Sequence, residues 1–164
     1  MTRWLNAQEQ QTWRAFLSAS KLVFEQLDRE LQRNTGMPHA YYEVLVRLSE
    51  APDRALRMSA LADRSQSSRS RLSHAVARLE ENGWVTRESC PEDKRGQTAR
   101  LTDQGFAALA AAAPAHVESV RTRVFDPLTA EQQAALREIS TALLAALAIT
   151  PDCTELADAP SLRS

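Results

Sequence analysis

The middle of the chain changes from a helical to an alternating pattern of apolar residues, and few folds accommodate that order. Leu61 and Ala62 form the apolar face of a short helix, for which Ser59 is a candidate N-cap. Residues 65–68 are polar and predict a turn, after which a second helix runs to about Glu81. This part of the chain is therefore expected to begin as a helix, a turn and a helix.

Two short strands are expected directly after these helices. Asn82 and Gly83 end the second helix, and Gly83 suits the left-handed position that follows a helix. Residues 84–87 and 98–101 predict two strands around the polar segment 90–97. A helix, a turn, a helix and a hairpin in this order are typical of a winged helix-turn-helix, in which the hairpin is the wing.

The second helix divides into an apolar and a polar face when its residues are placed at 100° intervals. The apolar face consists of Leu72, Ala75, Val76 and Leu79. The polar face consists of Ser67, Ser70, Arg71, Ser73, His74 and Ala77. It is rich in hydrogen-bond donors and has no carboxylate before Glu80. Such a helix is narrow enough to enter the major groove of DNA, while a hairpin can reach a flanking minor groove.

Amphipathic helices are expected before this unit. Apolar residues recur at helical spacing through residues 6–33. Met37 and Pro38 then open a second helix that extends to about Glu50, and a short strand is expected at residues 55–57.

Further helices are expected after Thr102, where apolar residues step by three or four and form one stripe. Pro114 should bend that helix or break it locally. Thr129 opens a last helix with a capping-box pattern, and Pro151 ends it. The fold expected is mostly α with a small β-wing. Its parts are an N-terminal helix (1–36), a winged helix-turn-helix lobe (37–101), C-terminal helices (102–150) and a flexible tail (151–164).

Charge is distributed unevenly although the net charge is only −1 at pH 7. Residues 56–100 carry nine basic and six acidic side chains, whereas residues 101–164 carry four basic and eight acidic ones. A basic middle segment fits contact with nucleic acid only where its charges share one face. The directions of several basic side chains are not fixed by the pattern: Arg57, Arg64, Arg87 and Arg100.

The sequence contains no pattern typical of a disulfide-rich protein, a metal-binding protein, an enzyme or a membrane protein. Cys90 and Cys153 alone make neither a disulfide framework nor a four-cysteine zinc site, and the three histidines are scattered. No serine-histidine-acid pattern or glycine-rich phosphate loop is present, so we expect no enzyme, no metal and no cofactor. No apolar run is long enough for a membrane span or a signal peptide, which favours a cytoplasmic protein.

Several motifs resemble the multiple antibiotic resistance regulator (MarR) family. They run through residues 58–105 and include Leu61-Ala62, the helix 70–80, Asn82-Gly-Trp-Val-Thr-Arg87, Asp93-Lys-Arg95 and Leu101-Thr-Asp-Gln-Gly105. The resemblance implies a homodimer, joined through the terminal helices, that binds a pseudo-palindromic operator in double-stranded DNA. It further implies a repressor that a small aromatic ligand often releases from DNA.

The resemblance also assigns roles to residues of the wing. Arg95 would enter the minor groove, Asp93 would orient it, and Lys94 would meet phosphate or water. Arg78 lies near a helix end, where a salt bridge explains it as well as a phosphate contact. The candidate DNA-binding residues are Ser67, Arg69, Ser70, Arg71, Ser73, His74, Arg78, Asp93, Lys94 and Arg95.

A ligand site is less well defined. In the MarR family the pocket lies between the dimerisation helices and the DNA-binding lobe, and the candidate residues are Trp13, His39, Tyr41, Tyr42 and His116. For each of them, packing between helices or a surface position explains the residue better than ligand binding. Cys90 near the wing could sense oxidants, but a chance position explains it better.

Two alternatives to a DNA-binding regulator stay open. A ligand-binding or protein-interaction dimer would explain the amphipathic helices, but not Asp93-Lys-Arg95 or the carboxylate-free helix face. A small-molecule enzyme is the third possibility, and a substrate screen without turnover would exclude it.

Overall fold

The first long helix, α1 (Ala7–Thr35), has both ends capped as its sequence requires. Asn6 accepts a hydrogen bond from the backbone N–H of Glu9 at 2.9 Å, and the Glu9 carboxylate accepts one from the Asn6 N–H at 2.8 Å. Gly36 ends the helix in the left-handed conformation, with a φ of 71°. This computed structural model describes the backbone of residues 1–90 and 93–147, and the side chains of all of these except 90 and 93–95.

Three helices form the body of the central lobe: α2 (His39–Ser49), α3 (Met58–Arg64) and α4 (Arg69–Glu81). A short 3-10 turn, η1 (Pro52–Arg54), connects α2 to the sheet. The helices meet in a core whose fully buried members include Leu45, Leu48, Leu61, Leu79 and Leu109. The helix-turn-helix predicted from the sequence is therefore present, with α3 and α4 as its two helices.

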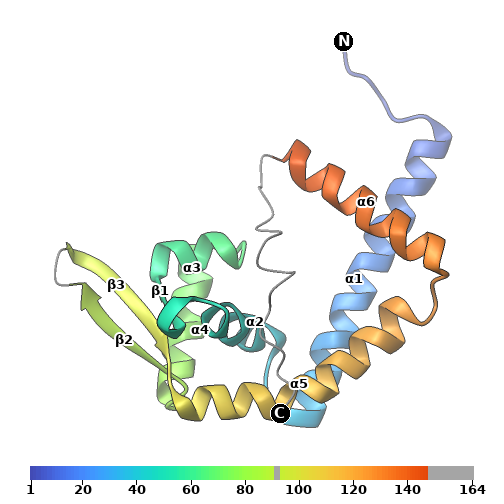
Figure 1. The fold of residues 1–164 in the computed structure, drawn as a ribbon. Helices are drawn as coiled ribbons and strands as arrows, with labels where there is room; N and C mark the ends of the chain where they lie inside the picture. The colour runs from blue at the N-terminus through green and yellow to red at the C-terminus, as the bar shows by residue number, and fades with distance from the viewer. Residues whose placement is uncertain (91–92, 148–164) are drawn as a thin grey trace.

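The sheet has the strand order β1-β3-β2, and both pairings are antiparallel. Its strands are β1 (Ala55–Arg57), β2 (Val85–Cys90) and β3 (Asp93–Leu101). In the register, Leu56 pairs with Ala99 and Thr86 with Arg100. Figure 1 shows the β2–β3 hairpin projecting from the lobe as a wing.

The wing strands are longer than the sequence predicts. Much of the polar segment expected as a loop belongs to β2 and β3. Residues 88–90 and 93–97 extend beyond the apolar core, so they pair through backbone hydrogen bonds and show no apolar alternation that a sequence pattern could detect.

The start of α3 also differs from the prediction. Arg57, not Ser59, is the N-cap, and its side chain makes no capping hydrogen bond. Because β1 leads directly into α3, the helix begins one residue before Ser59, which is an exposed residue of the first turn.

The junction between the wing and α5 (Asp103–Val120) depends on Thr102 and Gly105. The Thr102 hydroxyl donates to the Gly83 carbonyl at 2.7 Å and accepts from the Gly105 N–H at 3.0 Å. A Cβ on Gly105 would lie 2.1 Å from the Trp84 carbonyl oxygen, so the backbones approach too closely for a side chain. The leucine-threonine-x-x-glycine motif therefore fastens the helix end, the wing and α5 together.

Helix α5 continues through Pro114 without the break that the sequence allowed. Pro114 is exposed, so its ring can be accommodated on the solvent side, and α5 changes direction along its length in Figure 1. The helix then passes through a π-helical turn, η2 (Arg121–Phe125), and the chain reverses into α6 (Ala130–Ala146). The capping box predicted at Thr129 is present.

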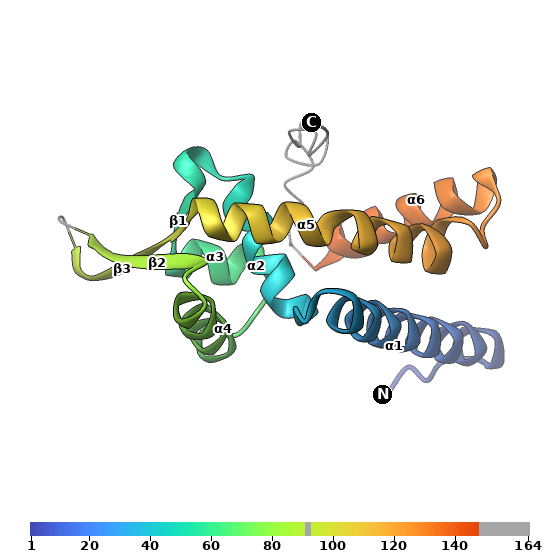
Figure 2. The same cartoon turned by 90° about the horizontal axis from the view of Figure 1, so that it is seen from below.

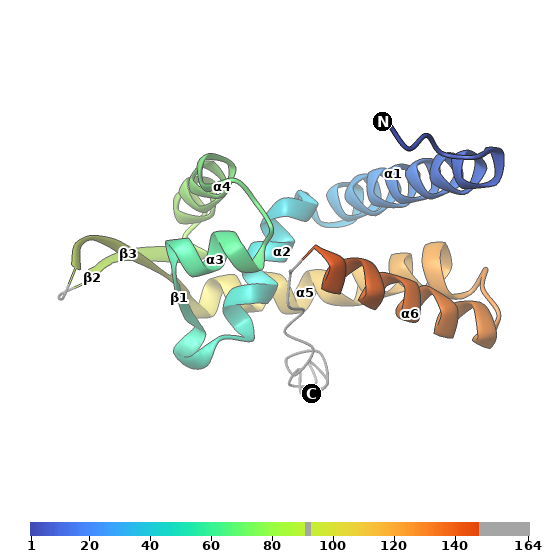
Figure 3. The same ribbon diagram turned by 90° about the horizontal axis from the view of Figure 1, so that it is seen from above.

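Helix α1, the second half of α5, η2 and α6 lie outside the lobe, and together they are called the arm (Figures 2 and 3). Figures 2 and 3 show α1 and the second half of α5 running beside each other away from the lobe, in the direction opposite to the wing. Arg123 and Glu30 join η2 to α1 by an ion pair. None of the described helices has the length and apolarity that crossing a membrane requires. The tail predicted at 151–164 lies outside the described residues, and the division into domains stays a prediction.

Candidate nucleic-acid interface

Helix α4 presents the polar face that the sequence predicts. Ser68 caps it by accepting a hydrogen bond from the Arg71 N–H at 3.3 Å. Leu72, Val76 and Leu79 are buried against the lobe. The exposed residues on the outer side are Arg69, Ser70, Arg71, Ser73, His74 and Arg78. Ser67 precedes the helix and is half-buried. The lobe thus holds α4 by its apolar side, while the roles of the outer residues in binding stay a prediction.

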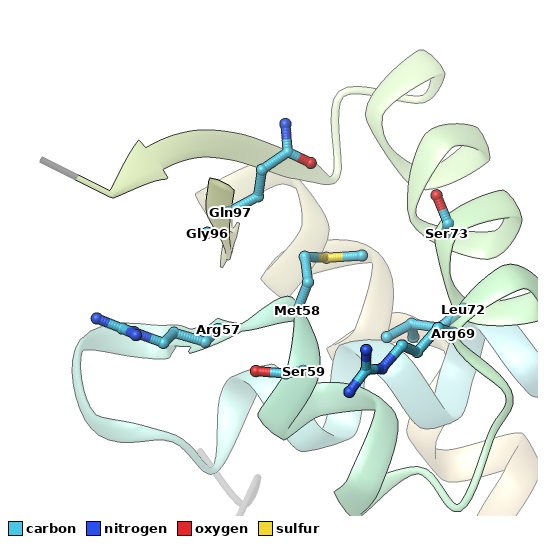
Figure 4. A pocket seen from close by; sticks show the side chains of 8 residues that line it. All are labelled: Arg57, Met58, Ser59, Arg69, Leu72, Ser73, Gly96 and Gln97. Carbon is cyan, nitrogen blue, oxygen red and sulfur yellow. The ribbon is translucent and has the colours of Figure 1, made fainter. Parts of the chain in front are cut away.

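A groove of about 430 Å³ separates α4 from the wing (Figure 4). Met58 and Leu72 provide its apolar part. The polar lining comes from four different elements and consists of Arg57, Ser59, Arg69, Ser73 and Gln97. Gly96 completes the groove, and no carboxylate occurs among these lining residues. The groove therefore offers hydrogen-bond donors and positive charge between the helix and the hairpin.

Three of the polar side chains that line the groove were not among the sequence-predicted site residues: Arg57, Ser59 and Gln97. Arg57 belonged to the basic residues of unknown direction, and Ser59 was expected as a helix cap. Gln97 lay in a predicted loop. Only the register of β3 against β1, in which Arg57 pairs with Thr98, brings these residues to one groove.

Two groups of arginines in the lobe bear on this surface. Those of the first group bind carboxylates: Arg87 binds Glu80, Arg100 binds Glu88, Arg78 binds Glu81, and Arg54 binds Asp103 at the start of α5. Arg100 also donates to the Asp53 carbonyl at 2.8 Å. The hydrogen bond from Arg78 to Glu81 raises the pKa of that guanidinium above its ordinary value.

The second group has no ion-pair partner among the described residues. Arg57, Arg69 and Arg71 are exposed, and all three lie at α4 or at the groove beside it. Unpaired guanidinium groups on one side of a lobe suit contacts to phosphate. The wing residues Asp93, Lys94 and Arg95 belong to β3, but their side chains, like that of Cys90, lie outside the part of the chain that the structure describes.

Three of the five candidate ligand-binding residues lie together at the junction of the lobe and the arm. The His116 ring is 4.4 Å from the Tyr42 ring and 5.4 Å from the His39 ring, measured between centroids. Phe24 of α1, which the sequence did not single out, lies 6.3 Å from His39. His116 Nδ1 is buried without a hydrogen-bond partner among the described residues. These rings form an aromatic cluster shared by α1, α2 and α5.

The other two candidates lie elsewhere. Trp13 is exposed on α1 and stacks on Phe16, at 6.0 Å between centroids. Tyr41 packs against the lobe core. Within the described part of the chain, no three histidine, cysteine, aspartate or glutamate residues are grouped as a metal site would need.

Burial shifts the pKa values of two side chains in the aromatic cluster, His116 and Tyr42. Desolvation lowers the pKa of His116 below its ordinary value, and the neighbouring His39 lowers it further. Desolvation likewise raises the pKa of the Tyr42 hydroxyl, with a smaller contribution from the charge of Glu50.

Comparison with known proteins gives a consistent result. A family model described as the MarR family matches residues 35–96. The chain is 34% identical over 70 residues to the HTH-type transcriptional regulator PecS of Dickeya dadantii, a match covering 43% of this chain and 42% of PecS. It is 30% identical over 119 residues to the transcriptional regulator HosA of Escherichia coli O111:H-, covering 68% of this chain and 86% of HosA.

Among solved structures, the chain resembles Sco3205, a MarR family transcriptional regulator from Streptomyces coelicolor in complex with DNA, with a TM-score of 0.83. That likeness has 57% identity and covers 87% of this chain and 89% of Sco3205.

Proposed function

The chain belongs to the MarR family, and we propose that it is a transcriptional regulator that binds a specific sequence in double-stranded DNA. The observation that carries this proposal is the outer face of α4. It presents serine, arginine and histidine side chains to solvent, while the opposite side is fixed by buried leucine and valine. A helix held in this way can enter a major groove about 12 Å wide and contact base edges.

The groove beside α4 supports a path for one DNA strand. A duplex that meets α4 in its major groove and the wing in its minor groove must pass a phosphate backbone between the two. Arg57 and Arg69 line that space, and neither has an ion-pair partner among the described residues. We assign them to phosphate contacts, which position the duplex and carry no sequence information by themselves. By the family resemblance, Arg95 enters the minor groove, Asp93 braces it, and Lys94 meets phosphate.

A second copy of the chain is the proposed partner of the arm. Large apolar side chains on α1 and α6 are exposed in the single chain, among them Trp13, Phe16, Leu17, Leu136, Ile139 and Leu143. A homodimer that covers them would present two α4 helices. Helices that read successive turns of one duplex lie about 34 Å apart, so the operator should be a pseudo-palindrome.

The regulator is proposed to act as a repressor that responds to a small aromatic ligand. The aromatic cluster of Phe24, His39, Tyr42 and His116 supports this, because it lies where the arm meets the lobe. A ligand that separates these rings would change the angle between the two parts and so the spacing of two α4 helices. Unchanged DNA affinity across a library of phenols and antibiotics would contradict this part of the proposal.

The test of DNA binding is a selection of random duplexes by the full-length protein. We expect one enriched pseudo-palindrome, bound with an affinity that falls as salt rises, by about 0.9 log units per log unit of salt for each neutralised phosphate. Arg71→Ala should weaken binding to that duplex by about 1–3 kcal/mol. Arg121→Ala removes the same charge from η2, outside the lobe, and serves as the matched control. Failure to enrich any sequence, or equal binding by Arg71→Ala, would favour an interaction dimer without DNA binding.

A further inference from the structure

One ion pair in the lobe differs from the others in burial and in the number of its hydrogen bonds. Glu80 lies in the last turn of α4, and Arg87 lies in β2. One oxygen of the Glu80 carboxylate accepts from the Arg87 backbone N–H at 3.0 Å. The other oxygen accepts from Arg87 Nε at 2.6 Å and lies 2.5 Å from Nη2. Both side chains are half-buried, at 27% and 29% exposure.

Among the described residues, the other ion pairs of α4 and the wing strands are exposed. Arg78 and Glu81 have exposures of 65% and 60%, and Arg100 and Glu88 have exposures of 41% and 54%. Exposed pairs of this kind contribute little to the order of a surface. A half-buried carboxylate that accepts several charge-assisted hydrogen bonds fixes its partner's orientation far better. Of these described pairs, the Glu80–Arg87 pair is therefore the one suited to holding two elements at a defined angle.

Arg87 is also the last residue of β2, within the part whose side chains the structure describes, that is not exposed. Val85, two residues earlier on the same face of the strand, is buried in the core. Ala99, the partner of Arg87 in the sheet, is fully buried as well. The next residues, Glu88 and Ser89, are exposed. At about 3.4 Å per residue, residues 88–90 carry the strand roughly 10 Å further, so a small rotation at Arg87 becomes a larger displacement at the tip.

The position of Glu80 needs an explanation in a surface that binds DNA. A carboxylate on the reading helix repels phosphate, and the outer face of α4 has none before it. We propose that Glu80 and Arg87 are positioning residues for DNA recognition. Their ion pair sets the angle between α4 and the wing, so that both reach adjacent grooves of one duplex. This inference rests on the proposed function, and it gives Arg87 a role different from that of the phosphate-binding arginines.

The sign of the effect of Glu80→Gln distinguishes positioning from plain electrostatics. If charge alone matters, removing a negative charge near DNA tightens binding. If the ion pair sets the angle between α4 and the wing, breaking it lets that angle vary and weakens binding. We expect Glu80→Gln to bind the selected duplex about fivefold to hundredfold more weakly, the loss typical of a missing arginine contact. Glu81→Gln is the matched control, because it removes the same charge from the neighbouring residue and releases Arg78 from its exposed pair. This control should bind at least as tightly as the parent protein.

Footprinting on the same duplex shows which contact is lost. In Glu80→Gln, protection of the flanking minor grooves from hydroxyl radicals should disappear, while protection of guanine N7 in the central major grooves from methylation persists. In the free protein, hydrogen exchange of the β2 amides should be faster in Glu80→Gln than in Glu81→Gln. If Glu80→Gln does not fold, Arg87→Lys provides the same test, because lysine keeps the charge and loses the planar fork.

The outcomes separate this inference from the proposed function. If the parent protein enriches no duplex, the proposed function fails and the inference fails with it. If the parent binds, and folded Glu80→Gln binds as tightly with its wing protection intact, only the positioning role is overturned. Loss of affinity in both Glu80→Gln and Glu81→Gln would also overturn it, because charge or stability would then explain the effect.

Discussion

Gly105 shows how one residue determines whether α5 can pack against the backbone that follows α4. Its missing side chain leaves room for the Trp84 carbonyl oxygen, which would lie 2.1 Å from a Cβ. Gly105→Ala must push α5 away from the end of α4, and we expect it to lower the free energy of unfolding by about 1–3 kcal/mol or more. Urea unfolding monitored by circular dichroism measures this loss.

Gly36 provides the control for that prediction. It has a φ of +71°, and a Cβ there would meet no atom within 4 Å. Gly36→Ala should therefore cost only the strain of a left-handed alanine, about 1–2 kcal/mol. If Gly105→Ala were the milder of the two, the close approach at Trp84 would not be essential to the junction.

Single side chains also show what the sequence can and cannot predict. The outward directions of Ser70, Arg71 and His74 follow from helical periodicity, because leucine and valine on the other face determine them. The directions of Arg87 and Arg100 depend on carboxylates that other strands or helices supply, so no local pattern contains them. The sequence therefore identified the polar face of α4 but not the ion pair between Glu80 and Arg87.

At the scale of elements, the aromatic cluster between α1, α2 and α5 makes stability depend on pH. The pKa of His116 is lower in the folded protein than its ordinary value near 6.5, first because of burial and then because of His39. The unfolded chain therefore binds the proton more readily, and stability should decrease as the pH falls below about 6.5. His116→Gln should flatten the dependence of the unfolding free energy on pH between 5 and 7. Above pH 7.5 the two proteins should differ by a constant amount, and an unchanged slope at lower pH would contradict the assignment.

Local signals predicted most of the elements, with the N-cap of α3 as an exception. The boundaries of α4 and the capping box of α6 match the predictions because caps and turns involve residues three or four apart. The meeting of His39 with His116 was suggested only by the family resemblance and not by any local pattern, since it depends on how α2 docks on α5. The wing strands were predicted too short because their outer halves are stabilised by pairing and not by burial.

At the scale of the whole molecule, much of the apolar surface of the arm is exposed in the described part of the chain. Among the described residues, α6 has no buried side chain, although Leu136, Ile139 and Leu143 share one face. On α5, Leu109 is buried whereas Val117 is exposed, so the stripe predicted as continuous is covered only in part. Helices with such uncovered faces gain most of their stability from packing against another surface. A second copy of the chain is the partner that we propose.

Ile139→Asp tests that partnership. A carboxylate in the centre of the apolar face of α6 would be buried without a counter-charge in a dimer, so the mutant should dissociate or unfold. The parent protein should sediment at twice the chain mass, and its thermal unfolding temperature should rise with protein concentration, because association stabilises the folded state by mass action. Thr141→Asp places the same charge on the opposite side of α6, where the threonine is exposed, and should leave the dimer intact. A parent protein that sediments as a single chain, with an unfolding temperature independent of concentration, would refute the dimer. It would also refute the proposal that two α4 helices bind the two halves of one palindromic operator.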